Sequence, residues 1–422
     1  MKSLLLIPFF CLNLFQDPPP KLSQVIEADL EYLIDFYQKR HRQPEVSLEE
    51  KETAKALAGE LRSIGFEVSE SVGGYGVVGM YKNGQGPTIL YRTDMDALPI
   101  TEKTGLDYAS TDGEMHACGH DMHMTTWVGT ARAMVKLKKD WKGTLMFIGQ
   151  PAEEIGQGAK MMLDAGLYDR FGVPDYGLGL HVSPTIPAGQ VGFGKGYTMA
   201  NAEMINIKVF GVGSHGASPH MSVDPVVLAS MMVMELQTIV SRTIDPRESA
   251  VVTVGAIQGG IRGNIIPDEV MLQLTVRTFE EEVRLKVHQR IREIARGTAI
   301  AAGLPEDKMP EVEIPEEFTP ANFNDPELVD VMWETATEAL GAENVVNTEP
   351  LMLGEDFACY GRTDDDVPTV LYWLGSVPEE RIASGDLPGL HSPFYYPEPR
   401  GTIETGVTVM SQTMLRLFNG QK

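Results

Sequence analysis

The chain has 422 residues, of which 43% are hydrophobic, and a length of this kind exceeds one compact core, so two domains are expected. There are 35 Lys and Arg residues against 59 Asp and Glu residues, which gives a formal net charge of -24. Because phosphate binding needs clustered Lys and Arg, this balance argues against a nucleic-acid partner. The three cysteines, Cys11, Cys118 and Cys359, are too few and odd in number for a disulfide framework.

The first segment resembles a secretory signal peptide. Lys2 precedes residues 4–15, which are apolar apart from Asn13. A short positive region followed by an apolar region of this length is typical of export signals, although Pro8 interrupts it and no A-x-A cleavage pattern follows. We expect residues 1–20 to be removed and the protein to be periplasmic or secreted; the alternative is a cytoplasmic protein.

Helices and strands are expected to alternate in the first half of the remaining chain. Apolar residues recur at helical spacing from Val25 to Tyr37, and residues 47–50 match a capping box that would open a second helix ending near Ile64. The elements that follow are strands at 76–81 and 88–91, a helix at 117–137, a strand at 143–148, a helix at 158–165 and a strand at 176–180. This order predicts an α/β domain with a mostly parallel sheet and helices on both faces.

The pattern changes near residue 200. Strands are expected at 204–210, 250–257, 270–276 and 311–314, and helices at 224–241, where Asp224 is the cap, and at 280–302. The order β-α-β-β-α-(β) fits a ferredoxin-like α+β unit. The α/β pattern resumes with a helix at 326–340, a strand at 369–374 and a helix at 402–418. We therefore divide the chain into a larger domain, at 21–199 and 315–422, and an inserted unit at 200–314.

Residue types that bind metal ions occur at three places, each beside a predicted strand end. The segment Met115–His123 contains a thiol, three imidazoles and a carboxylate, Glu153 and Glu154 follow the strand 143–148, and His181 ends the strand 176–180. Ligands collect outside the carboxyl ends of strands in parallel sheets. The mixture of sulfur, imidazole and carboxylate suits zinc, manganese, nickel or cobalt.

Two adjacent glutamates indicate which reaction these metal-binding residue types could support. One of Glu153 and Glu154 can bind a metal ion while the other acts as a general base, which favours metal-assisted hydrolysis. Cys118 and His120 can reach one ion only from an irregular or extended backbone, and Gly119 permits such a backbone. Each residue alone has a structural interpretation, as a buried thiol, a helix cap or a solvated turn, so the combination carries the hypothesis.

Other residues are candidates for binding and orienting roles. Asp94 and Asp96 follow a predicted strand and could orient histidine ligands or cap the strand. His215 and Asn264 lie in Gly-rich loops of the inserted unit, where they could donate to a scissile carbonyl or belong to flexible loops. Arg277 ends a strand and could pair with a substrate carboxylate.

Together these motifs resemble the amidohydrolase branch of the zinc-dependent aminoacylase/carboxypeptidase superfamily, which includes hippurate hydrolases, N-acyl-amino-acid amidohydrolases and auxin-conjugate hydrolases. The His-Ala-Cys-Gly-His-Asp string at 116–121 is the most specific of them. The motifs follow the order of the family from about residue 25 to residue 415 and lie at 41–45, 92–99, 115–123, 150–154, 180–181, 213–220, 354–357 and 390–393.

The resemblance implies a metal pair with a bridging water, and five metal ligands: Cys118, His120, Glu154, His181 and His391. It also implies that Glu153 takes a proton from the attacking water and that His215 stabilises the oxyanion. In relatives the inserted domain is a lid that also forms the dimer, so His215 could act on the site of the partner subunit. The expected substrate is a small N-acyl amino acid, cleaved to a carboxylic acid and an amino acid by a homodimer or larger assembly.

Two alternatives are kept. The first is a metallo-dipeptidase or carboxypeptidase with the same chemistry, although in those relatives a His-x-Asp usually replaces the Asp-Met-Asp at 94–96. The second is a non-catalytic exported protein that binds an acyl amino acid. The presence of Glu153 and of all five ligands argues against the second alternative.

Overall fold

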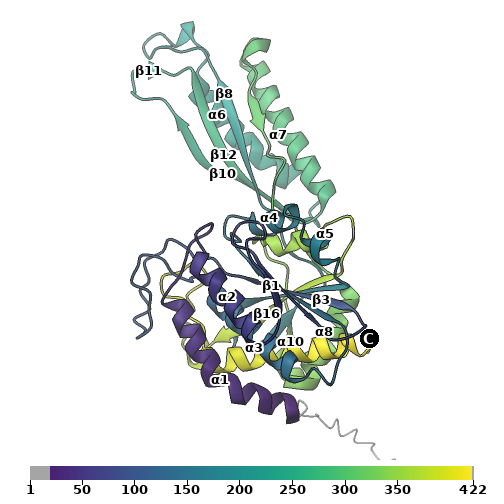
Figure 1. Cartoon of the computed structure of the whole chain (residues 1–422). Coiled ribbons are helices and arrows are strands. Elements are labelled where there is room, and N and C mark those ends of the chain that lie inside the picture. Colours follow the sequence, from purple (N-terminus) through teal and green to yellow (C-terminus); the bar gives the residue numbers. More distant parts are fainter. Residues whose placement is uncertain (1–19, 421–422) are drawn as a thin grey trace, which may run out of the picture.

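The computed structural model describes residues 20–420, and the predicted signal peptide therefore lies almost wholly outside the described residues. A narrow α+β domain projects from a larger α/β domain (Figure 1). The elements of the projecting domain run from β8 to β13, and the chain enters the larger domain again after them. The candidate site lies where the two domains meet.

The larger domain is built on an eight-stranded sheet, and its strands follow in spatial order: β1 (Glu67–Ser69), β2 (Val77–Lys82), β4 (Thr144–Gln150), β3 (Thr88–Asp94), β5 (Tyr176–Pro187), β16 (Thr369–Val377), β6 (Val191–Phe193) and β15 (Val345–Asn347). The four central strands, β4, β3, β5 and β16, are all parallel. Antiparallel pairing is confined to β1–β2, β2–β4 and β6–β16. The predicted α/β class with a mostly parallel sheet is confirmed.

Helices cover both faces of this sheet, as predicted. Ile89 and Tyr91 of β3 join one apolar cluster, whereas Leu90 joins another on the opposite face, which is the two-residue period of a strand buried on both sides. The first face is covered by α1 (Pro20–His41), α2 (Lys51–Ser63), α3 (His120–Lys136), α8 (Pro326–Leu340) and α10 (Pro399–Phe418). The second is covered by α4 (Gly158–Asp164), α5 (Leu167–Phe171) and the 3-10 helix η5 (Asp356–Gly361).

The prediction that His181 ends a strand is wrong, because β5 continues to Pro187. The parallel register of β3 and β5 pairs Tyr91 with Leu178, and three further residues along each strand bring His181 level with Asp94, the last residue of β3. The imidazole therefore still lies at the carboxyl edge of β3. The strand continues because β16 pairs with it far beyond that edge.

The predicted capping box before α2 is also wrong. The hydroxyl of Ser47 donates to the carboxylate of Asp96 at 2.7 Å and does not cap the helix. The carboxylate of Glu45 accepts instead from two amides in the first turn of α2, at 3.1 and 2.7 Å. The segment before α2 is thereby fixed to the end of β3.

The inserted domain contains β8 (Glu203–Phe210), α6 (Pro225–Thr238), β10 (Ala250–Gly259), β12 (Glu269–Thr278), α7 (Glu281–Ala301) and β13 (Glu311–Glu313). Its antiparallel sheet has the order β10-β12-β8-β13, which is the order of a ferredoxin-like unit, and it has its own apolar core. Asp224 caps α6 as predicted, accepting from the Val226 amide at 2.9 Å. A ribbon of β9 (Ser214–His215) and β11 (Ile265–Ile266) lies at the end farthest from the larger domain (Figure 1).

Candidate metal centre and active site

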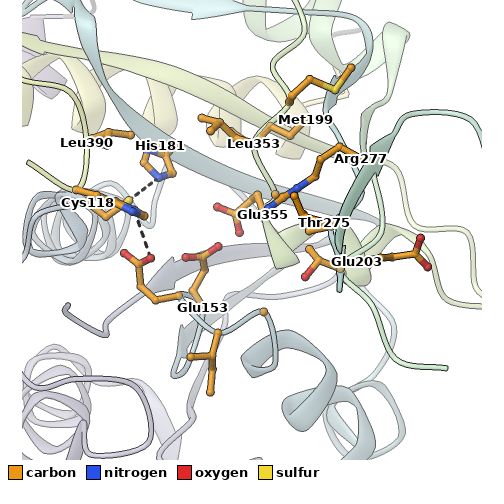
Figure 2. Close-up of a pocket in the computed structure, with 18 of the residues that line it drawn as sticks. Cys118, Glu153, His181, Met199, Glu203, Thr275, Arg277, Leu353, Glu355 and Leu390 are labelled. Carbon is orange, nitrogen blue, oxygen red and sulfur yellow. Dashed lines mark hydrogen bonds and ion pairs between the residues drawn. The ribbon is translucent and has the colours of Figure 1, made fainter. Parts of the chain in front are cut away.

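The five predicted ligands meet at the carboxyl edge of the large sheet and are called the metal cluster below: Cys118, His120, Glu154, His181 and His391. The sulfur of Cys118 lies 3.5 Å from Nε2 of His181 (Figure 2). Nε2 of His391 lies 3.4 Å from Oε2 of Glu154, and Nε2 of His120 lies 3.9 Å from Oε1 of Glu154.

The cluster divides into two donor groups that share one thiol. The ligand atoms of Cys118, His120 and His181 lie within 4.8 Å of one another. Those of Cys118, Glu154 and His391 do so as well. A donor that belongs to both groups could bridge two neighbouring ions.

The donor atoms fit divalent metal. Nε2 of His120 and Oε1 of Glu154 are buried and have no hydrogen-bond partner in the described part of the chain, which is costly for polar atoms unless a ligand satisfies them. Burial, followed by the Glu154 carboxylate, raises the pKa of the Cys118 thiol, and burial raises the pKa of Glu154 to about 7. A divalent cation opposes both effects by favouring thiolate and carboxylate.

A tight backbone brings the thiol and the first histidine together. Helix α3 begins at His120, three residues later than expected, so Cys118 lies on an irregular stretch before it. Gly119 has φ 80°, and a Cβ atom there would lie 2.5 Å from Cγ2 of Val182 on β5. Glycine is therefore needed both for the conformation and for the approach to the sheet.

Asp96 joins one ligand to another. Its backbone carbonyl lies 2.9 Å from Nδ1 of His120, and its carboxylate accepts from the Glu154 amide at 2.9 Å and from Ser47. These contacts fix the ring of His120 so that Nε2 faces the cluster. Outer contacts of this kind orient ligands in metal sites.

Asp94 contacts a histidine outside the metal cluster. One of its oxygens lies 2.7 Å from Nδ1 of His123, and Nε2 of His123 accepts from the Val182 amide at 2.9 Å. Both ring nitrogens of His123 are therefore engaged. These two contacts hold the His123 ring in the wall of the site, between Asp94 and β5.

The loop that carries His391 reaches the cluster from the far end of the chain. His391 has φ 63° and is half-exposed, and its amide donates to the carbonyl of Ala117 at 2.9 Å. Burial and then the nearby His120 lower the pKa of His391. A neutral imidazole is the form that binds a metal ion.

Glu153 lies beside the cluster, among other carboxylates. One of its carboxylate oxygens lies within 4.8 Å of a carboxylate oxygen of Glu355 and of one of Asp356. Figure 2 shows the side chains of Glu153 and Glu355 pointing toward one another. Burial raises the pKa of Glu153 well above its ordinary value, with Glu355 and Asp356 adding to the effect. A carboxylate with a raised pKa can accept a proton and pass it on near neutral pH.

A buried guanidinium balances these acids, and sequence reasoning missed it. Arg92 donates to Asp94 at 2.6 Å, to Glu355 at 2.9 Å and to Asp356 at 3.1 Å, and to Gln150 at 2.9 Å. The signal was available, since Arg92 directly follows the apolar run Ile89–Tyr91 in β3, and a buried cation needs acidic partners.

A cavity of about 510 Å³ extends from the metal cluster toward the inserted domain. Its apolar lining includes Met199, Leu353 and Leu390, and Arg277 reaches into it from β12 (Figure 2). No carboxylate within residues 20–420 forms an ion pair with Arg277, and burial lowers its pKa without removing its charge. The cavity therefore has donors for metal at one end and an unpaired cation at the other.

The structure does not bring His215 and Asn264 into this cavity. Both lie at the ribbon at the far end of the inserted domain, where the Gly216 amide donates to the carbonyl of Asn264 at 2.8 Å. Nδ1 of His215 accepts from the Ala217 amide at 3.1 Å. Within one chain these two residues cannot contact a substrate at the metal cluster.

Residues 90–416 match the model of peptidase family M20/M25/M40. The chain is 39% identical over 324 residues to the hippurate hydrolase of Campylobacter jejuni, covering 76% of this chain and 82% of the relative. It is 36% identical over 366 residues to thermostable carboxypeptidase 1 of Saccharolobus solfataricus, covering 86% of this chain and 90% of the relative. The solved structure of the Bacillus subtilis YxeP protein, a dinuclear metal-binding peptidase of family M20, superimposes with a TM-score of 0.77 at 30% identity, covering 93% of this chain and 99% of the other.

The fold and the site define a metal-dependent hydrolase, and these similarities show its family. The chain belongs to peptidase family M20/M25/M40. It is an amidohydrolase of that family, which confirms the resemblance noted in its sequence.

Proposed function

We propose that the protein hydrolyses the amide bond of N-acyl amino acids and releases a carboxylic acid and an amino acid. The observation that carries this proposal is that the metal cluster and Glu153 on one side, and the unpaired Arg277 on the other, share one cavity (Figure 2). The free α-carboxylate of the amino acid would pair with Arg277, which leaves the amide carbonyl at the metal cluster. Both named relatives fit this requirement, since hippurate and the end of a peptide each join an amide to a free carboxylate.

Glu153 moves the proton in this reaction. Divalent ions held by the metal cluster would polarise the amide carbonyl and lower the pKa of water. Glu153 takes a proton from the attacking water and gives it to the nitrogen of the leaving amino acid. Arg92 keeps Glu355 and Asp356 in place around it.

We propose two ions per site, drawn from zinc, manganese, nickel and cobalt. The two donor groups that share Cys118 support the number, and so does the dinuclear relative. The thiol favours the softer ions, while carboxylate and imidazole suit all four. The ion in the cell depends on metal supply as well as on affinity.

We further propose a homodimer through the inserted domain. β10 is an edge strand of the inserted sheet, where Ile257 is 54% exposed, and α6 exposes Val227, Met231 and Met234. The segment Pro225–Thr243 is long and apolar enough to span a membrane, with a mean hydropathy of 1.2, but the other face of α6 lies in the core of the inserted domain. A second copy of the chain would cover both the edge strand and this apolar face.

Such a dimer would give His215 and Asn264 a function. The ribbon that carries them extends away from its own cavity, so it would approach the cavity of the partner subunit. His215 would then stabilise the oxyanion there, together with the ions. The inserted domain would act as a lid on one site and as a donor to the other.

We also propose that residues 1–20 direct export. The apolar stretch after Lys2 supports this. Fractionation of cells expressing the full chain and a chain starting at residue 21 tests it, because both products in the cytoplasm would refute export.

The substrate proposal is tested by amine release from N-acetyl-, N-benzoyl- and indoleacetyl-amino acids and from dipeptides. Chelated enzyme is supplied in turn with Zn²⁺, Mn²⁺, Co²⁺ or Ni²⁺. Metal-restored cleavage of acyl amino acids in preference to dipeptides is the expected result. A preference for dipeptides would identify a peptidase, and stoichiometric metal binding without any turnover would refute hydrolysis.

A further inference from the structure

The loop after β4 holds two consecutive glutamates in an unusual arrangement. Consecutive residues of an extended chain point to opposite sides. Here the ligand atoms of Glu153 and Glu154 both lie within 4.8 Å of Nε2 of His120. The backbone at Glu153 and Glu154 is therefore not extended, and residues 153–156 form a turn whose direction is set where it begins.

The turn is made by a non-glycine residue in the left-handed region. Ala152 has φ 53°, a conformation that L residues other than glycine rarely adopt. Its carbonyl accepts from the amides of Gln157 and Gly158, at 3.2 and 3.1 Å. Strained residues of this kind persist only where their surroundings hold them, and they cluster at active sites.

Glu50 holds the other side of this turn. Its Oε1 accepts from the Ala152 amide at 2.8 Å, across 102 positions of sequence. The side chain is fully buried, and Oε2 has no hydrogen-bond partner among the described residues. Burying a carboxylate with one oxygen unsatisfied lowers the stability of the fold. A contribution to stability therefore does not explain why a carboxylate stands at this position.

The segment that carries Glu50 also acts on Glu154, through Ser47 and Asp96. Ser47 donates to Asp96, whose carboxylate accepts from the Glu154 amide. Residues 47–50 therefore act on both sides of Glu153, through Glu50 on Ala152 and through Asp96 on Glu154. The loop is held from a segment that is distant in sequence and makes no contact with the substrate cavity.

We infer that Glu50 is a positioning residue that holds Ala152 in its left-handed conformation, which directs the turn carrying Glu153 and Glu154 toward the metal cluster. This inference rests on the proposed function of the two glutamates. Glu50 itself touches neither the metal cluster nor the cavity. Its effect is on the geometry of the base and of one ligand.

The test compares E50Q, E50M and E50A, each alone and with A152G. Glutamine keeps an acceptor for the Ala152 amide, methionine keeps the length without an acceptor, and alanine keeps neither. Glycine adopts φ 53° freely, so A152G removes the need for the hydrogen bond. E49M, at the exposed neighbouring glutamate, is the matched control.

Turnover of N-benzoylglycine and Mn²⁺ affinity are measured for each purified variant. E50M and E50A are expected to lose roughly 10- to 100-fold in kcat and in Mn²⁺ affinity, since misplacement of about 1 Å has effects of that size. KM should change by less than about threefold, because Arg277 is untouched. E50Q and E49M should remain within about threefold of the parent, and A152G should restore at least about tenfold to E50M and E50A.

Three results would overturn the inference: parent-like turnover and affinity in E50M, equal damage in E50Q and E50M, or no recovery with A152G. Loss of folded protein in both acceptor-free variants that persists when A152G is added would do so as well, because Glu50 would then serve folding in general. If the acceptor-free variants folded only when combined with A152G, the inference would be supported. A parent enzyme that binds Mn²⁺ without cleaving any acyl amino acid would refute the proposed function, while the affinities would still test the turn.

Discussion

The two domains differ in which energetically unfavourable side-chain environments they contain: buried charges in one and exposed apolar side chains in the other. The larger domain buries charge, since Arg92 and its carboxylate partners Asp94, Glu355 and Asp356 are at most 2% exposed. The inserted domain exposes apolar surface, with Met234 72% and Ile261 87% exposed. Buried charges are tolerated when they are paired, and apolar surface is tolerated when another chain covers it. The larger domain therefore completes its network within one chain, whereas the inserted domain leaves apolar surface that the proposed homodimer would cover.

The largest effect is expected inside the larger domain, at Glu153. E153Q removes the proton acceptor but not the ligands, so kcat should fall by roughly 10²- to 10⁴-fold while metal content stays unchanged. The turnover number and the metal content are measured on the same sample of E153Q and compared with those of the parent. Normal turnover in E153Q would show that another group is the base.

The next effect tests whether the inserted domain completes a site in its partner. H215A should lower kcat by roughly 10²- to 10³-fold, the range for loss of an oxyanion donor. Mixing H215A with E153Q under conditions that exchange subunits should restore about a quarter of parental activity, because half of the dimers are mixed and each has one intact site. No recovery in a mixture shown to contain mixed dimers would place His215 outside the partner's site.

A smaller effect tests the sharing of Cys118 between the two donor groups. C118A should lower the affinity for both ions by at least about 10-fold, since loss even of an outer contact has effects of about 10- to 100-fold. H391A, which belongs to one group only, is the comparison. Titration of the chelated proteins with Zn²⁺ would show one weakened site in H391A and two in C118A; a single weakened site in C118A would mean that the thiol serves one ion.

The smallest effect on turnover is expected at His41, which acts on stability. Burial alone would lower its pKa, but hydrogen bonds to Asp121 and Glu102 raise it to about 9. The stabilisation is therefore fully present below the unfolded pKa of about 6.5 and is lost as pH rises through about 9, and it amounts to at most about 3 kcal/mol. Urea unfolding at pH 6 and pH 9.5 should show a smaller difference in H41Q than in the parent or in H220Q, an exposed control; equal differences would assign the effect to other groups.

The sequence predicted what depends on local pattern. The ligand types stand beside strand ends, and the parallel order of the strands brings those ends together. The switch from α/β to α+β near residue 200 was visible in the change of element order. The cap at Asp224 follows from an Asp-Pro pair, which needs no distant partner.

Features that depend on distant partners were not accessible in the same way. The end of β5 is set by β16, and the position of Ser47 is set by Asp96. The charge network of Arg92 needs Glu355, which is 263 residues away. His215 was assigned to the active site by resemblance, and only the geometry shows that its own cavity is out of reach.

The order of the strands has a consequence for biosynthesis. β16 lies between β5 and β6 in the sheet, although β6 ends at Phe193 and β16 begins at Thr369. A nascent chain emerging from the ribosome therefore holds an incomplete sheet while the whole inserted domain is being made. His391 is translated later still, so metal can be fully enclosed only after nearly the entire polypeptide has been released, and a prematurely terminated chain would carry an open, incomplete centre.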